Sequence, residues 1–296
     1  VQSFEKFRYT AFNIEEWKIM ISKKIPLNHE DIQALTKRSN AQALVMLSAN
    51  WGLIAAAFAL AAIWPNPLTV IAAVLIIGGR QLGLAVLVHE CSHYSFFTSR
   101  KVNIFVGRWL CAWPVHLSYD EYRAGHLGHH AHAGTVKDPD VKLIQAYPVP
   151  KDSLRRKLIR DITGQTATRD FKSLWVRSNT RRRISIVLVP VILGVVLSAF
   201  GALWTLSLWY LAFFTVLPMY SRIRLIGEHG IAPDRLHKDA RLNTSTVRPN
   251  LVERLFIAPN NVSLHVEHHL LATVPAYRLK TLHKILWDRG YYQGYN

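Results

Sequence analysis

The sequence predicts an all-α integral membrane protein with two transmembrane helical hairpins (four spans) and a cytoplasmic helical cap. Three observations lead to this fold class. The chain has two long apolar stretches without charge, and Pro or Gly residues that disfavour helix interrupt each stretch near its middle. Lys and Arg residues cluster at one end of the expected hairpins. Half of the 296 residues are hydrophobic, and this length allows one or two domains. We expect a single membrane domain, residues 1–296.

The apolar stretches define the spans. Residues 41–79 contain no Asp, Glu, Lys or Arg, and neither do residues 184–221. One helix crosses the hydrocarbon with about 20 residues, so each stretch is roughly two crossings long. Pro65 and Pro67 interrupt the first stretch and Gly201 the second, and both residue types disfavour continued helix. We expect a first hairpin at about 42–88 (helices 42–64 and 68–88) and a second at about 184–221 (helices 184–200 and 203–221). Soluble core hairpins fit less well, because soluble helices need a polar face.

The basic residues predict how the hairpins are oriented. The tips at 64–67 and 200–201 carry no Lys or Arg, whereas the other ends carry Lys37, Arg38, Arg100, Lys101, Arg181, Arg182, Arg183, Arg222 and Arg224. By the positive-inside rule, residues 1–40, 89–183 and 222–296 are then cytoplasmic, and so are both termini. We expect a multi-pass protein of a bacterial inner membrane.

The formal net charge of +17 therefore falls mostly on one face. Such a face attracts anionic head groups and acidic protein partners. Nucleic acid is not an expected partner, because the basic residues adjoin the spans and no nucleic-acid motif is present. Residues 1–40 resemble a short amphipathic cap with Asn28 as a helix N-cap. They contain no apolar core segment of a cleavable signal peptide.

Fourteen histidines are present, and most of them fall into three helix-spaced groups. His89 and His93 are four residues apart, and two further groups repeat the spacing i, i+3, i+4: His126, His129 and His130, then His265, His268 and His269. Residues three and four apart share one helix face, so each group should point its imidazoles the same way. All three groups lie just beyond the spans on the predicted cytoplasmic side. His229 joins them, about two turns past the predicted end of the fourth span.

These groups predict a metal site. Crowded neutral imidazoles gain little by packing and protonated ones repel, whereas imidazole is a good ligand for Zn, Cu, Fe and Ni. Structural zinc usually takes four ligands including Cys. Here eight or nine histidines suffice for two ions, and spacing alone does not choose between iron, zinc and copper.

The three groups, in this order, resemble the histidine boxes of the membrane fatty acid desaturase and hydroxylase superfamily. The boxes are His89-Glu-Cys-Ser-His93, His126-Leu-Gly-His129-His130 and His265-Val-Glu-His268-His269, with the second hairpin between boxes two and three. The resemblance covers roughly residues 40–290. It implies two iron ions, with O2 as co-substrate, held by the box histidines and one further histidine, for which His229 fits by position. The implied ligand set is His89, His93, His126, His129, His130, His229, His265, His268 and His269.

The resemblance also implies an O2-dependent lipid desaturase that introduces a double bond into a fatty acyl chain. Such a site needs two external electrons per turnover. No haem-attachment, flavin or iron–sulfur motif is present, so we expect an external donor such as a ferredoxin-like protein with its reductase. The alternatives are a hydroxylase or ketolase of a fatty acyl or carotenoid-like lipid, and, from another class, a membrane metal transporter or sensor. A transporter should carry polar residues through its spans.

Several other polar residues lie near the boxes or within a span. Asp138, Asp140, Glu228 and Glu267 lie near the boxes and could orient the ligating rings, because such rings usually donate their second N–H. Arg80 is the one charge inside a span and could contact a carboxylate, a head group or a box residue. His132 is a weaker ligand candidate, and His29, His116, His237 and His283 are expected to make ordinary polar contacts.

Overall fold

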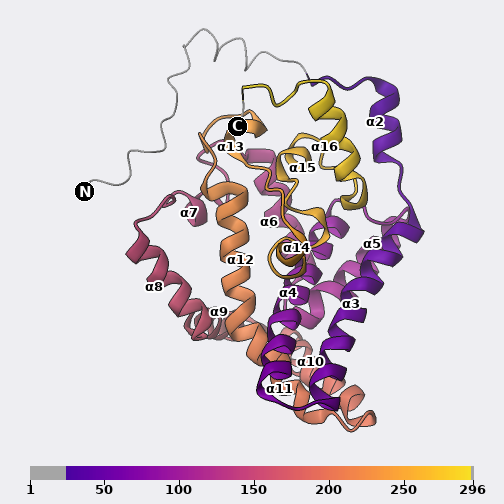
Figure 1. The fold of residues 1–296 in the computed structure, drawn as a ribbon, viewed down its shortest axis with the longest axis vertical. Helices are drawn as coiled ribbons and strands as arrows, with labels where there is room; N and C mark the ends of the chain where they lie inside the picture. Colours follow the sequence, from indigo (N-terminus) through magenta and orange to yellow (C-terminus); the bar gives the residue numbers. More distant parts are fainter. Residues whose placement is uncertain (1–24, 295–296) are drawn as a thin grey trace.

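The structure is a computed structural model that describes residues 25–294. Over these residues it is helical, apart from one isolated β-bridge between Thr246 and Leu264. Four of its helices are long and apolar enough to cross a membrane. They form two hairpins whose turns lie at one end of the molecule, while α2, α13, α15 and α16 lie at the other end (Figure 1). The predicted fold class, a multi-pass helical protein, is confirmed.

The first hairpin consists of α3 (Asn40–Ile63) and α4 (Pro67–Ser92). Asn66 caps α4 by accepting hydrogen bonds from the Leu68 and Thr69 amides, and Pro67 occupies the first helical position, which needs no N–H donor. The sequence predicts an end near residue 88, but α4 continues to Ser92. Its 26 residues span about 39 Å at 1.5 Å per residue. That is longer than a hydrocarbon core of about 30 Å.

The second hairpin consists of α10 (Thr180–Ala199) and a continuous helical span, Leu203–Gly230. This span contains η3 (Leu203–Thr205), α11 (Leu206–Leu211), η4 (Ala212–Val216), α12 (Leu217–Leu225) and η5 (Ile226–Gly230), of which η4 and η5 are π-helical.

The sequence predicts that this span ends near residue 221, but the helix continues to Gly230. The charges that suggested an end are paired. Arg222 donates to Asp161 with an Nη2–Oδ1 distance of 2.9 Å, and Arg224 Nε lies 2.7 Å from Glu228 Oε1. His229 consequently lies in the last turn of the span rather than two turns beyond it.

Helix α4 is the central helix of the bundle. In its most apolar stretch of 18 residues, 67% of the residues are buried, compared with 22% in the corresponding stretch of α10. The short helix α14 (Leu251–Phe256) packs directly on it at Gly79, where a Cβ atom would lie 2.6 Å from the Leu255 carbonyl oxygen. Arg80 donates to the backbone carbonyls of Arg254 (3.0 Å) and Leu255. Arg80 therefore links α14 to α4, and among residues 25–294 its side chain hydrogen-bonds neither a carboxylate nor a box residue.

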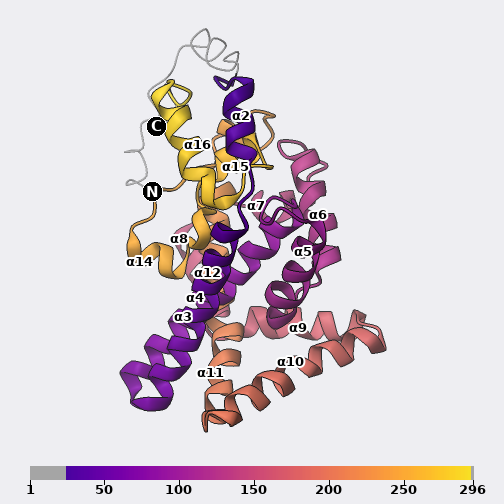
Figure 2. The ribbon, with the colours of Figure 1, turned by 90° about the vertical axis from the view of Figure 1, so that its right-hand side faces the viewer.

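The segment between the hairpins runs from box one to α10 in several short helices. These are α5 (Arg100–Phe105), η1 (Val106–Ala112), η2 (Trp113–Val115), α6 (Tyr119–His132), α7 (Val141–Ile144), α8 (Lys151–Ile162) and α9 (Gln165–Arg177). In Figure 2, α9 lies across the molecule beside the start of α10. Asp161 in α8 is fully buried and binds Arg222, so the segment is anchored to the fourth span.

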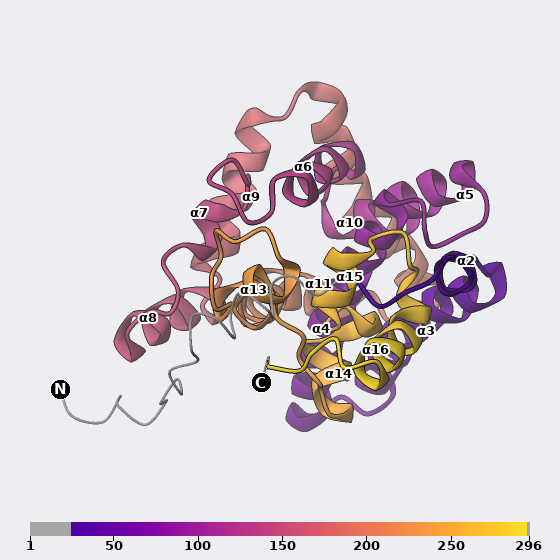
Figure 3. The ribbon, with the colours of Figure 1, turned by 90° about the horizontal axis from the view of Figure 1, so that it is seen from above.

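The C-terminal part of the cap follows the fourth span. It contains α13 (Ala240–Asn243), α14, η6 (Pro259–Asn261), α15 (His265–Leu270), η7 (Ala276–Arg278) and α16 (Leu279–Asp288). Helix α2 (His29–Thr36) joins it at the other end of the chain, with Asn28 Oδ1 2.8 Å from the Asp31 amide, so the predicted N-cap is confirmed. Residues 1–24 of the predicted N-terminal segment lie outside the described residues. Seen from above, α2 and α16 lie on one side of the molecule and α7 and α8 on the other (Figure 3).

Candidate metal centre

Box one lies at the C-terminal end of α4. His89 lies within α4 and is 1% exposed, and His93 is the C-cap residue that follows the last residue of this helix. Box two lies on α6, which Ser118 caps by accepting a hydrogen bond from the Glu121 amide. Box three opens α15 with His265. Three helices from distant parts of the sequence thus bring the boxes to one place at the end of the bundle.

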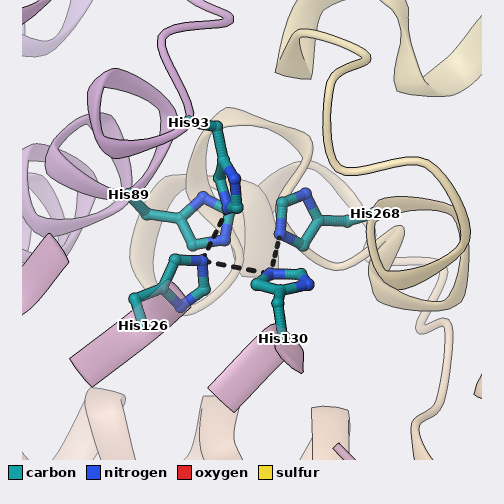
Figure 4. Close-up of side chains that lie close together, drawn as sticks. All are labelled: His89, His93, His126, His130 and His268. Atoms are coloured by element: carbon teal, nitrogen blue, oxygen red, sulfur yellow. Dashed lines mark hydrogen bonds between the residues drawn. The ribbon is translucent and has the colours of Figure 1, made fainter. Parts of the chain in front are cut away.

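Five histidines from all three boxes form a first cluster, in which the imidazoles converge (Figure 4). One nitrogen of each lies within 4.8 Å of those of the others. The Nε2–Nε2 distances are 2.8 Å between His93 and His126, 3.2 Å between His126 and His130, and 2.9 Å between His130 and His268. The members are His89, His93, His126, His130 and His268.

A second cluster lies beside the first. The ligand nitrogens of His129, His229 and His269 lie within 4.8 Å of one another. His265 adjoins this group, with its Nε2 2.9 Å from His229 Nε2. The two clusters are contiguous, because the His130 and His269 rings stack with centroids 4.6 Å apart. All nine sequence-predicted histidines are therefore in the two clusters, divided five and four.

The hydrogen bonds at the outer ring nitrogens show why these clusters suit metal ions. Nδ1 of His89 lies 3.0 Å from Glu90 Oε1, and Nδ1 of His129 lies 2.9 Å from Asp138 Oδ1. Carboxylates only accept, so these Nδ1 atoms carry the protons and each Nε2 presents a bare lone pair to the cluster. The Nε2 of His89 is buried and has no hydrogen-bond partner among residues 25–294. Converging lone pairs repel one another unless a cation lies between them, so the donor set fits bound metal.

Burial lowers the pKa of several cluster imidazoles and so favours their neutral form, which is the form that binds metal. Burial lowers the pKa of His93 to about 4, and the nearby Arg123 adds to this effect. Burial likewise lowers the pKa of His130 to about 3, with a further contribution from His93. The pKa values of His126, His265, His268 and His269 also lie well below the ordinary value, first through burial and then through neighbouring imidazoles.

The carboxylates near the boxes have different roles. Asp138 orients His129, and its Oδ1 also accepts the Asp140 amide at 2.8 Å. Asp140 itself is more distant, 3.8 Å from His129 Nδ1. Glu228 pairs with Arg224 and approaches His265 only to 3.9 Å. Glu267 contacts no box histidine through its side chain and instead binds His283, Thr246 and Tyr292.

Glu90 is an orienting residue that the sequence analysis missed. It is 2% exposed, and its second oxygen accepts the Ala276 amide at 2.8 Å, so it connects box one to the turn before α16. The only sequence signal was its position beside His89. Neighbours on a helix usually point in different directions, so that position does not predict the contact.

Asp138→Asn is expected to weaken metal binding by roughly 10- to 100-fold, because loss of an outer carboxylate partner usually has this effect. The new side-chain amide can donate a hydrogen bond from its NH₂ group to His129 Nδ1. That favours the tautomer with its proton on Nε2, which cannot bind metal through Nε2. Metal content after dialysis against a graded series of chelator concentrations measures the effect. Asp140→Asn, at 3.8 Å from the same nitrogen, is the matched control and should retain metal nearly as the parent does. Equal retention by both variants would contradict the assigned role of Asp138.

The remaining histidines lie outside the clusters. His132 is exposed at the end of α6. His116 is buried, and its Nε2 lies 3.4 Å from the Tyr210 hydroxyl. His237 accepts the Asp239 amide through Nδ1, and His283 lies between Glu267 and Arg248. The contacts of His116, His237 and His283 are the ordinary polar contacts that the sequence predicts for them.

A comparison with protein families shows the family of this chain. The family model described as fatty acid desaturase matches residues 65–296, which include all three boxes and His229. The chain belongs to the fatty acid desaturase family. It is therefore an oxidoreductase of the desaturase type, and the resemblance drawn from the boxes is confirmed.

Three curated proteins show detectable sequence identity to this chain. The dihydrorhizobitoxine desaturase of Bradyrhizobium elkanii is 28% identical over 252 residues, covering 77% of this chain and 70% of that protein. The sn-1 oleoyl-lipid 12-desaturase of Synechocystis sp. is 24% identical, covering 70% and 65%. The chloroplastic omega-6 fatty acid desaturase of Glycine max is 25% identical, covering 71% and 54%. The chain thus spans a little over half to about two thirds of the length of the two lipid desaturases.

Proposed function

We propose that the nine clustered histidines hold two iron ions and that the chain uses O2 to introduce a double bond into a fatty acyl chain. The observation that carries this proposal is the pair of contiguous, imidazole-only clusters at the end of α4. Two groups of five and four imidazole nitrogen donors match two ions, whereas a structural zinc site needs one group of four, usually with Cys.

An unactivated C–H bond is beyond the reach of any side-chain acid or base, so the bound irons supply the oxygen chemistry. Written in full, a –CH₂–CH₂– unit, O2, two electrons and two protons give –CH=CH– and two waters. Two electrons must therefore come from outside in each turnover. The sequence has two cysteines, too few for an iron–sulfur cluster of its own. We propose a ferredoxin-like protein with its reductase as the donor.

The protein's own contribution is to hold and orient the ligands and to receive the chain. Glu90 and Asp138 fix the rings of His89 and His129. An apolar cavity of about 280 Å³ opens beside Ala85, one helical turn before His89 on the same face of α4. Phe171, Phe213 and Leu217 line it further. We propose that the reacting part of the acyl chain lies here, because alkyl chains favour such surfaces.

We also propose that the boxes and both termini face the cytoplasm, since the basic residues flank that end of the spans. Reporter fusions at Asn66 and Gly201 should then report the opposite side of the membrane from fusions at Thr135 and Asn296. A non-cytoplasmic signal at Thr135 would contradict this orientation.

Product analysis tests the proposed reaction. The chain is expressed in a host of known lipid composition, and lipids are profiled by mass spectrometry beside the same host with the His268→Ala chain. We expect new lipids that have lost two hydrogens. Gain of an oxygen instead would show a hydroxylase or ketolase. Since one relative is named for dihydrorhizobitoxine, the profile should include non-lipid extracts, and a desaturated product found only there would replace the acyl substrate.

A further inference from the structure

A basic groove lies on the cap, outside the metal centre. One wall is a single face of α16, where Lys280, His283, Lys284 and Trp287 follow at i, i+3, i+4 and i+7. Arg248, Pro249 and Arg254 form the opposite wall, and the floor includes Ser263 and Leu264. The groove has a volume of about 380 Å³. We refer to these residues as the α16 groove.

The cations of the α16 groove are poorly neutralised. Within residues 25–294, no carboxylate lies within 4.0 Å of the charged groups of Arg248, Arg254 or Lys280, and only Lys284 has an acidic partner, Asp288. Arg248 instead packs over the Trp287 ring at 4.3 Å and contacts His283 Nε2 at 3.1 Å. The groove therefore presents a concentrated positive field together with an exposed aromatic ring.

The groove is directly connected to box three. Its floor residue Leu264 is covalently followed by His265, a member of the second cluster. From the wall, His283 Nδ1 hydrogen-bonds Glu267, which lies on α15 immediately before His268. The Tyr292 hydroxyl binds the same carboxylate. A molecule in the groove that contacts Leu264 therefore touches the residue next in sequence to His265.

We propose that the α16 groove is the docking site of the acidic one-electron carrier protein that reduces the metal pair. This inference rests on the proposed function. In each turnover, two reduced carriers each give up one electron to the metal pair and leave oxidised. A protein partner fits better than a lipid phosphate, because the cations extend along a whole helix face beside Trp287, which is 52% exposed. Arg and Trp are the side chains that protein interfaces favour.

Charge reversal at Lys280 and Lys284 tests the docking site. Both are exposed, and a carboxylate at residue 280 lies in the first turn of α16, where the helix dipole favours it. The matched control reverses Lys142 and Arg156, two exposed cations on the α7–α8 side of the molecule (Figure 3). The probe is an oxidised plant-type [2Fe–2S] ferredoxin, and its Kd for the full chain in an uncharged detergent is measured at low and high salt.

We expect Lys280→Glu/Lys284→Glu to bind ferredoxin at least about tenfold more weakly than the parent at low salt, with a shallower salt dependence. The control should stay within about twofold. Reduction by ferredoxin should slow in the groove variant, while the final extent of metal reduction by dithionite stays unchanged, which shows that the site is intact.

Unchanged ferredoxin affinity in the groove variant would overturn the docking site. Retained ferredoxin binding with lost binding to phosphatidylglycerol vesicles would also overturn it and would make the groove a lipid phosphate site. Binding through the groove to a chain whose metals dithionite cannot reduce would support the docking site and overturn the proposed function, so the two failures are distinguishable.

Discussion

A His268→Ala chain is expected to enter the membrane in normal amount, to lose at least one of the two proposed metal ions and to lose activity by more than roughly 100-fold. His268 is 1% exposed, its Nε2 lies 2.9 Å from His130 Nε2, and its ring centroid lies 4.2 Å from that of His89. Its replacement removes the histidine that box three contributes to the first cluster. The measurements are metal content per chain and substrate turnover in isolated membranes.

His132→Ala is the matched control for this substitution. His132 is a box-two neighbour on α6, but it is exposed and lies outside both clusters. Its alanine variant should keep two metals and near-normal turnover. A His268→Ala chain that retains both metals, or that turns over as fast as His132→Ala, is incompatible with the proposed centre.

The second large effect is expected for His229→Ala, which should lose metal and activity as severely as His268→Ala. In the sequence His229 stands apart from the boxes, and eight box histidines would suffice for two four-coordinate ions by counting. In the structure its Nε2 lies 2.9 Å from His265 Nε2, and its ring centroid lies 4.9 Å from that of His129. The Asn243 carbonyl, 3.5 Å from its Nδ1, accepts the outer proton.

His116→Ala separates loss of a ligand from loss of a buried ring, because His116 and His229 are both 5% exposed. His116→Ala should lower stability and leave metal content unchanged. Metal content of His229→Ala equal to that of His116→Ala would remove His229 from the centre and leave an eight-ligand site.

Much of the fold and centre is predictable because both rest on strong local patterns. Uncharged apolar stretches and their Pro and Gly breaks located four spans, and the three helix-spaced groups located the histidines that meet at one end of the bundle. The end of the fourth span was not predictable. In the sequence, Arg222 and Arg224 end the uncharged stretch and so suggest the end of the helix. Only the folded structure shows that Asp161 and Glu228 pair with these two arginines, so that the helix can continue.

The division of the histidines was also beyond the sequence. His129 and His130 are neighbours on α6, yet they belong to different clusters, because adjacent helical residues diverge by about 100°. Glu90 and Glu267 both adjoin a box histidine in sequence, but only Glu90 contacts its neighbouring ring. Side-chain direction at such positions depends on packing between segments, which one sequence pattern does not encode.

The most direct test of the central claim is the metal content of the purified chain from cells supplied with iron. With two contiguous imidazole clusters and the proposed desaturase chemistry, we expect close to two irons per chain and little zinc. Stoichiometric zinc, or a single metal ion per chain in a protein that is otherwise active and folded, would contradict the di-iron centre.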